Sequence, residues 1–238
     1  VGTNKTVTIT PTYSGADVGN YSVTDQSTAT GNIVAKALTA TASAANKTYD
    51  GTTTATTTLT FTGLVGTETL GQTVGSTFDN KNVGTGKTVT VNSITLANGS
   101  NGGLAANYSI SPGQTTTADV TAKALTVSAS TSNKIYDATT LANTTLTLNG
   151  LIGSETLNVT GNSNFDNKNI GSGKTVTINS ITLADGTNGG LASNYSITTG
   201  QITTATVTAK SLIVSGITAS NKSYDTTTSV SLNTSSLS

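Results

Sequence analysis

The chain has 238 residues, and its eleven lysines, with no arginine, balance eleven acidic residues to a formal net charge of zero. This balance gives neither a basic surface for phosphates nor an acidic tail, so nucleic acid is not an expected partner. Histidine, cysteine, methionine and tryptophan are absent, which excludes disulfides and thiol or imidazole metal ligands. No stretch reaches 18 consecutive apolar residues, so we expect no membrane span.

The sequence repeats itself with a period of 87 residues. The string TAKAL recurs as VAKAL before it and TAKSL after it, which aligns Lys36, Lys123 and Lys210 (123 − 36 and 210 − 123 are both 87). Self-similarity at a fixed period is the signature of a tandem repeat. We therefore expect complete repeats at residues 36–122 and 123–209.

Partial repeats flank the two complete ones. Residues 1–35 resemble the end of a repeat, because VGTNKTVTIT matches VGTGKTVTV, and residues 210–238 resemble the start of one. A cut through a longer array would leave such pieces, and we prefer this interpretation. In the alternative, the C-terminal piece of one chain is completed by the N-terminal piece of another, as in strand addition.

Alternating apolar and β-branched residues predict half-buried strands, for example at Lys87–Leu96 and Ala124–Ala129. Clusters of Asn, Asp and Gly at residues 98–103 and 185–190 predict tight turns between strands. The short strands and frequent turns of each period favour an all-β fold, an Ig-like antiparallel β-sandwich in each repeat. A β-helix is disfavoured because no shorter period is visible within the 87 residues.

The junctions between repeats lack a flexible linker. The sequences ADVTAKALTV and ATVTAKSLIV run from the last strand of one repeat into the first strand of the next without a Pro-, Gly- or Ser-rich stretch. We therefore expect the repeats to form an elongated, stiff rod.

One motif recurs near the start of each repeat, as NKTYDGTT, NKIYDATT and NKSYDTTT. These strings resemble the hallmark of the YDG repeat domain, and the resemblance covers essentially the whole chain. It implies an Ig-like β module found in tandem in very large bacterial surface proteins, including filamentous-haemagglutinin-like adhesins. Only Gly51 keeps the glycine of the motif, whereas Ala138 and Thr226 replace it, so we expect no obligatory left-handed backbone there.

The resemblance implies an extracellular location at the bacterial cell surface and a structural role. We expect a stalk or spacer that extends a binding tip and so serves cell adhesion or biofilm formation. Its partners would be neighbouring repeats of the same chain, and a host or matrix receptor outside these residues. One alternative is a self-assembling extracellular fibre of identical chains. A second is a weak carbohydrate-binding module, which is disfavoured because only Tyr13 lies outside the recurring tyrosine positions.

The recurring motif supplies the candidate structural residues. We expect each lysine to pair with the nearby aspartate at a strand entrance and each tyrosine to fill the edge of the core. A Lys–Asn isopeptide crosslink is the chemical alternative. The motif residues are Lys47, Tyr49 and Asp50, then Lys134, Tyr136 and Asp137, then Lys222, Tyr224 and Asp225.

No arrangement of side chains indicates catalysis. Glu68 with Asp79 could be imagined as a glycosidase pair, but the same pair recurs in the next repeat, which favours architecture. We expect no enzyme activity and no cofactor. Calcium is a weak possibility in the FDNKN strings, although Lys81 opposes a cation there and a turn is favoured. The calcium candidates are Asp79, Asn82, Asp166 and Asn169.

Overall fold

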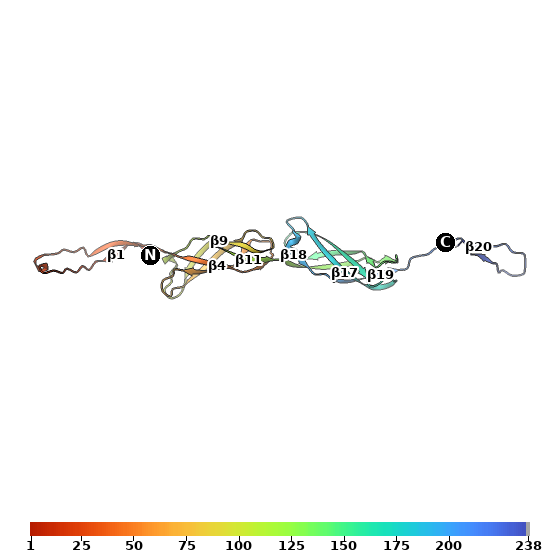
Figure 1. Cartoon of the computed structure of the whole chain (residues 1–238), viewed down its shortest axis with the longest axis horizontal. Helices are drawn as coiled ribbons and strands as arrows, with labels where there is room; N and C mark the ends of the chain where they lie inside the picture. The colour runs from red at the N-terminus through yellow and green to blue at the C-terminus, as the bar shows by residue number, and fades with distance from the viewer. Residues whose placement is uncertain (237–238) are drawn as a thin grey trace. The chain divides into compact units, whose positions relative to one another are not determined.

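The computed structural model describes residues 1–236, which are almost entirely β-structure with three short 3-10 turns. They form two compact units (Figure 1). The first unit comprises residues 1–124 with two short later segments, 152–154 and 191–196. The second unit comprises the remaining described residues from 125 onward. The expectation of an all-β fold with tandem repeats is confirmed.

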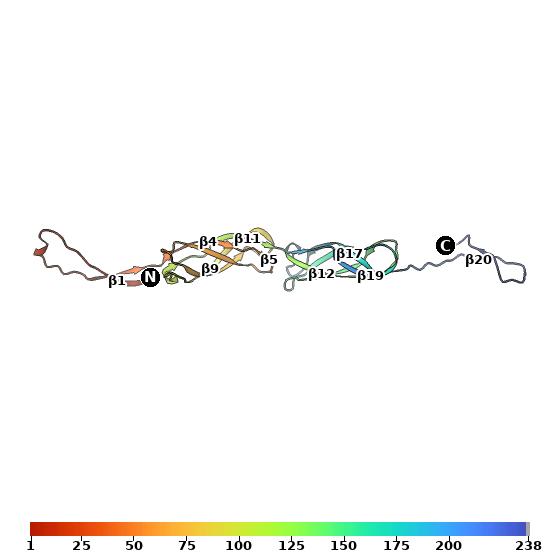
Figure 2. The same ribbon diagram turned by 90° about the horizontal axis from the view of Figure 1, so that it is seen from below.

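The first unit is built on a five-stranded sheet with the strand order β5-β11-β9-β8-β6. Two smaller pairings, β4 with β7 and β3 with β10, accompany it. Figure 2 shows β5 beside β11. The strands are β3 (Lys36–Ala37), β4 (Thr39–Ala44), β5 (Lys47–Thr48), β6 (Thr54–Ala55), β7 (Thr57–Thr62), β8 (Leu70–Phe78), β9 (Gly84–Asn98), β10 (Tyr108–Ser109) and β11 (Thr115–Thr121), with the 3-10 turn η2 (Ala105–Asn107) before β10.

The second repeat reproduces this plan with the five-stranded order β13-β19-β17-β16-β14 and a smaller sheet, β15-β12-β18. Its strands are β12 (Lys123–Thr131), β13 (Lys134–Ile135), β14 (Leu141–Ala142), β15 (Thr144–Asn149), β16 (Leu157–Phe165), β17 (Gly171–Asp185), β18 (Tyr195–Ile197) and β19 (Ile202–Thr208), with η3 (Ala192–Asn194) before β18.

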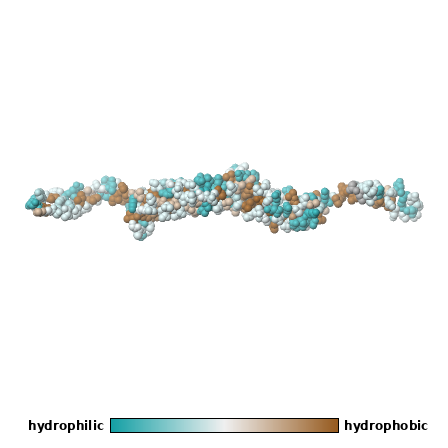
Figure 3. Space-filling model, viewed as in Figure 1, coloured by the Kyte–Doolittle hydropathy of each residue, from teal (hydrophilic) through white to brown (hydrophobic). Residues whose placement is uncertain are grey.

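The end segments form only small sheets. Strand β1 (Gly2–Thr8) pairs with β2 (Thr28–Ile33), and η1 (Val18–Asn20) lies between them. Near the other end, β20 (Thr218–Ala219) pairs with β21 (Leu232–Asn233). Large apolar side chains of these segments are exposed, Leu212 and Ile213 among them. Elsewhere, apolar and hydrophilic residues are interspersed on the visible face (Figure 3).

One bulge in each long hairpin keeps the apolar side chains on a single face. In β9, Val89 and Val91 are almost fully buried, and the next inward residues are Ile94 and Leu96 rather than the odd-numbered positions. The register explains this shift, because Ser76 pairs with Val91 and Gly75 pairs with Ser93, leaving Asn92 as the extra residue. Such a residue is a β-bulge, and it restores the inward alternation.

The core of each repeat lies between its two sheets. In the second repeat, Phe165, Val176 and Val207 of the large sheet form a buried cluster, with Tyr136 packed against it. The small sheet covers this face: a Cβ on Gly161 of β16 would lie 2.8 Å from Leu146 of β15. Each repeat is therefore a two-sheet sandwich.

The expectation of a purely antiparallel sandwich is wrong at its edge. Strand β5 pairs with β11 in parallel, and β13 pairs with β19 in parallel. The reason is that the chain leaves β4, crosses to the other sheet within two residues and continues as β5, next to the last strand of the repeat. Parallel pairing is possible here because most of the repeat connects the two strands.

Candidate functional site

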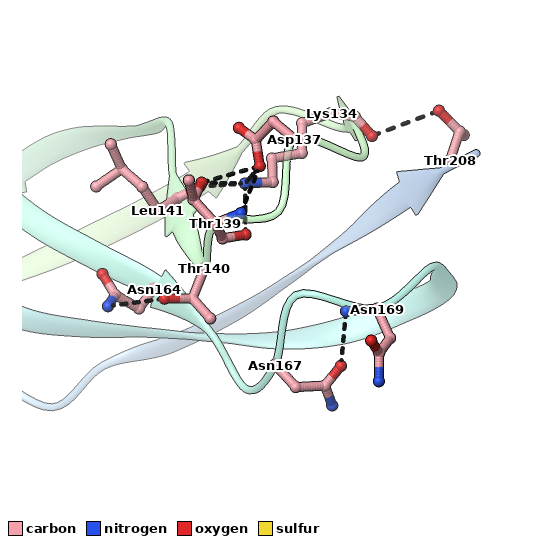
Figure 4. A network of polar contacts seen from close by, with 9 residues as sticks. All are labelled: Lys134, Asp137, Thr139, Thr140, Leu141, Asn164, Asn167, Asn169 and Thr208. Carbon is pink, nitrogen blue, oxygen red and sulfur yellow. Dashed lines mark hydrogen bonds and ion pairs between the residues drawn. The ribbon is translucent and has the colours of Figure 1, made fainter. Parts of the chain in front are cut away.

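The recurring lysine motif forms a polar turn at the start of each complete repeat (Figure 4). The Lys134 Nζ lies 2.8 Å from Asp137 Oδ1 and 2.9 Å from the carbonyl oxygen of Leu141. It also lies 3.0 Å from both the carbonyl and the hydroxyl oxygen of Thr139. The Thr139 amide and hydroxyl in turn donate to Asp137 Oδ1. One ammonium therefore closes the turn between β13 and β14.

This ammonium is shielded from water. The Lys134 side chain is 17% exposed, and its Nζ lies 5.6 Å from the centre of the Phe165 ring. The hydrogen bond from Lys134, supported by those from Thr139, lowers the pKa of Asp137 to about 2 from its ordinary 3.8. The carboxylate therefore stays ionised over the whole physiological pH range, which fits a fixed ion pair rather than a proton donor or acceptor.

The first repeat holds the same network. The Lys47 Nζ lies 2.8 Å from Asp50 Oδ1 and from the Thr52 carbonyl oxygen, and 5.5 Å from the centre of the Phe78 ring. Lys222 makes the same pair with Asp225 at 2.7 Å. The partners of these ammonium groups are aspartate, threonine and main-chain oxygens.

The backbone of this turn is left-handed at the YDG glycine position in all three copies. The φ angle is 79° at Gly51, 67° at Ala138 and 66° at Thr226. The expectation that replacing the glycine removes this conformation is wrong. The turn imposes it because the lysine and aspartate hydrogen bonds fix the chain on both sides, so Ala138 and Thr226 adopt a conformation that costs about 1–2 kcal/mol.

The three motif tyrosines differ in burial. Tyr49 is 1% exposed and Tyr136 is partly buried, whereas Tyr224 is 92% exposed. The expected core-edge position is therefore not found for Tyr224. The described residues beyond 210 form only the β20–β21 pair, which provides no sheet to cover the ring.

A second lysine, which we did not predict from the sequence, organises the FDNKN loop. The Lys174 Nζ lies 2.8 Å from both Asp166 Oδ1 and Asn167 Oδ1, and its side chain is 9% exposed. Lys87 repeats these contacts with Asp79 and Asn80. The sequence feature that could have revealed this lysine is the recurrence of GKTVT at a fixed distance after each FDNKN string.

Lys87 and Lys174 occupy the carboxylates that were candidate calcium ligands. Asp79 and Asp166 each bind an ammonium group, which a metal ion would have to displace. Asn82 is not aimed at Asp79: its amide nitrogen donates to Asn80 and its side-chain oxygen accepts a hydrogen bond from Asn194. Asn169 likewise donates its amide to Asn167 (Figure 4). In residues 1–236, no cluster of three or more acidic side chains could hold a metal ion.

The tyrosine of each later Asn-Tyr pair caps a loop. The Tyr108 hydroxyl accepts the Val65 amide at 3.1 Å and donates to the Glu68 carboxylate, and this hydrogen bond is the main reason why the pKa of Tyr108 is raised. Tyr195 accepts the Ile152 amide at 3.0 Å in the same way. Glu68 therefore accepts a hydrogen bond from the Tyr108 hydroxyl. In a glycosidase site it would instead act together with Asp79.

Comparison with family models matches the YDG domain twice, at residues 34–118 and 121–204. These matches cover more than half of the chain, so the chain belongs to the YDG domain family. Its polar networks recur in both matched copies and are hydrogen-bonded inward, as structural elements are. Neither the curated proteins nor the solved structures gave a match. Among the described residues, no helix is long and apolar enough to cross a membrane.

Proposed function

We propose that these repeats are a structural spacer of a secreted bacterial cell-surface adhesin. The observation that carries the proposal is the junction between the complete repeats. Strand β11 ends at Thr121 and β12 begins at Lys123, so a single residue separates the last strand of one repeat from the first strand of the next. A connection of this length restricts bending between repeats, which suits a stiff extension of the chain.

The chemistry of the two-sheet repeats supports the same role. The lysines of the motif turns, and Lys87 and Lys174 after the FDNKN loops, are held in ion pairs inside the repeat, which leaves them poorly available to a substrate. A chain with no cysteine and no methionine also resists oxidation outside the cell.

Two measurements test the spacer proposal. Sedimentation velocity should give a monomer of 23.7 kDa with a frictional ratio well above that of a compact protein. A frictional ratio typical of a compact protein would contradict a stiff extension. Antibodies raised against the chain should bind intact cells of its source and lose that binding after external protease treatment. Binding only after lysis would contradict the surface location.

A further inference from the structure

The first unit includes two short segments of the second repeat, residues 152–154 and 191–196. The later segment carries Asn194, which is 0% exposed. The Asn194 Oδ1 accepts a hydrogen bond from the Val83 amide at 2.9 Å, and its Nδ2 donates to Asn82 Oδ1 at 3.1 Å. Asn194 therefore binds the last residue of the first FDNKN loop and the residue that follows it.

An aromatic contact accompanies these hydrogen bonds. The ring of Tyr195, the residue after η3, meets the Tyr49 ring edge-on, with centroids 5.5 Å apart, and both residues are buried. The Tyr195 hydroxyl also accepts the Ile152 amide at 3.0 Å, which ties the segment 152–154 to this Asn-Tyr turn. The turn and the segment therefore contact the first repeat together.

Ile152 lies against the glycine of the first motif turn. A Cβ on Gly51 would lie 2.8 Å from Ile152 Cγ2, which is closer than two carbon atoms approach without displacement. The left-handed backbone does not by itself require the glycine, since Ala138 and Thr226 adopt the same conformation with φ angles of 67° and 66°. The residue at this position of the first repeat is instead limited by the space that Ile152 occupies.

Asn194 suits its position because its two partners are one donor and one acceptor. The Val83 amide donates and Asn82 Oδ1 accepts, and an asparagine side chain carries both complementary groups. A side chain of similar size without these groups, such as leucine, would leave two partly buried polar groups unpaired, which is costly. The two hydrogen bonds therefore favour asparagine at the end of this turn.

We propose that the motif turn and the end of the FDNKN loop of the first repeat form a docking site for the following repeat of the same chain. The site recognises the Asn-Tyr turn through Asn194 and Tyr195, and it recognises an apolar side chain through the space left by Gly51. Gly51 and Asn194 are therefore specificity-determining residues for which repeat can follow which. The proposal goes beyond the spacer role, because it makes the stability of the first unit depend on residues of the second repeat.

Amide hydrogen exchange on the full chain tests the docking. Asn194→Ala should raise the exchange rate of the Val83 amide roughly tenfold, as expected for one lost hydrogen bond. It should raise the rate of Val89, a fully buried residue in the core of the first repeat, by a similar factor, because the first unit loses stability. Ser193→Ala, at an exposed position of the same η3 turn, is the matched control and should leave both rates unchanged. An unchanged Val89 rate in Asn194→Ala would overturn the proposal.

A double-mutant cycle at Gly51 and Ile152 tests the recognition without removing a hydrogen bond. Gly51→Ala should raise the Val89 exchange rate roughly tenfold in the otherwise unmutated chain. The same substitution should raise it by a smaller factor in the Ile152→Ala background, because the contacting Cγ2 methyl group is then absent. Equal factors in the two backgrounds would mean that the glycine serves only the turn, and would overturn its assignment. Neither outcome changes the sedimentation behaviour expected of a spacer, so the two proposals fail separately.

Discussion

Lys134 lies with its ammonium group over the Phe165 ring, 5.6 Å from the centroid, so the charged end of the motif lysine is packed on the core of its repeat. The Phe165 side chain is 3% exposed and belongs to the buried cluster of the large sheet. The motif turn and the core are therefore coupled, because the lysine that closes the turn also covers a core aromatic.

Replacing Lys134 with methionine should destabilise the second unit by about 1–3 kcal/mol. Methionine keeps an apolar stem over Phe165 but leaves Asp137 and the Leu141 carbonyl without the ammonium. Urea unfolding followed at the Val176 amide resonance measures the change. The matched control is Lys168→Met, on an exposed side chain, which should change stability by less than about 0.5 kcal/mol. Equal effects of the two substitutions would contradict a stabilising role for the turn.

Acid should weaken the second unit through Asp137. The pKa of this carboxyl is about 2 in the folded protein against an ordinary 3.8, so the folded state favours the ionised form. Its contribution is therefore complete above about pH 4 and is lost as the pH falls towards about 2. Thermal unfolding between pH 6 and pH 2 should show a smaller decline for Asp137→Asn than for the unmutated chain. Parallel declines would contradict the assignment.

Placing a glycine at the left-handed position of the motif turn should stabilise the protein. Ala138 has a φ of 67°, so Ala138→Gly should stabilise the second unit by about 0.5–1 kcal/mol, after the entropy that glycine adds to the unfolded chain. The reverse change at the equivalent position, Gly51→Ala, should destabilise by about 1 kcal/mol or more, because the new Cβ would lie 2.8 Å from Ile152 Cγ2. Denaturation of both variants checks the signs, and the same sign for both would refute the interpretation.

Deleting the bulge residue should unfold the second unit. Asn179 is the extra residue of β17, since Ser163 pairs with Ile178 and Asn162 pairs with Ser180. Without it, either Ile181 and Leu183 or Val176 and Ile178 must turn to solvent, because a one-residue shift reverses every side chain. Asn179→Ala keeps the residue count and should cost less than about 1 kcal/mol. Amide spectra that stay native after the deletion would show that the bulge is dispensable.

Much of the fold followed from local pattern. The alternation in KTVTVNSITL predicted a strand, and the structure places β9 over it. The Asn-Gly-Gly clusters predicted turns, and Asn101 and Asn188 indeed have positive φ angles, each followed by a left-handed glycine. Such features can be predicted from the sequence because inward and outward positions alternate along a strand and because few residues tolerate a left-handed backbone.

Only part of the candidate site could be predicted from the sequence. The spacing in the sequence was enough to bring Lys134 near Asp137, since the two residues are three positions apart across one turn. It could not bring Lys174 to Asp166, because that contact depends on a hairpin that folds the start of β17 back over the FDNKN loop. The parallel edge strands were missed for the same reason: their partners lie about 70 residues away in sequence.

The sequence by itself determined the period of 87 residues, the β-character of each repeat and the position of the motif turn, because these depend on residues close together in the chain. Only the tertiary structure decided which sheet each short strand joins, which lysine meets which aspartate, and that one Asn-Tyr turn is buried while an aligned one is exposed. Those outcomes depend on groups that come into contact only after distant strands have paired, and a local sequence pattern does not predict such contacts.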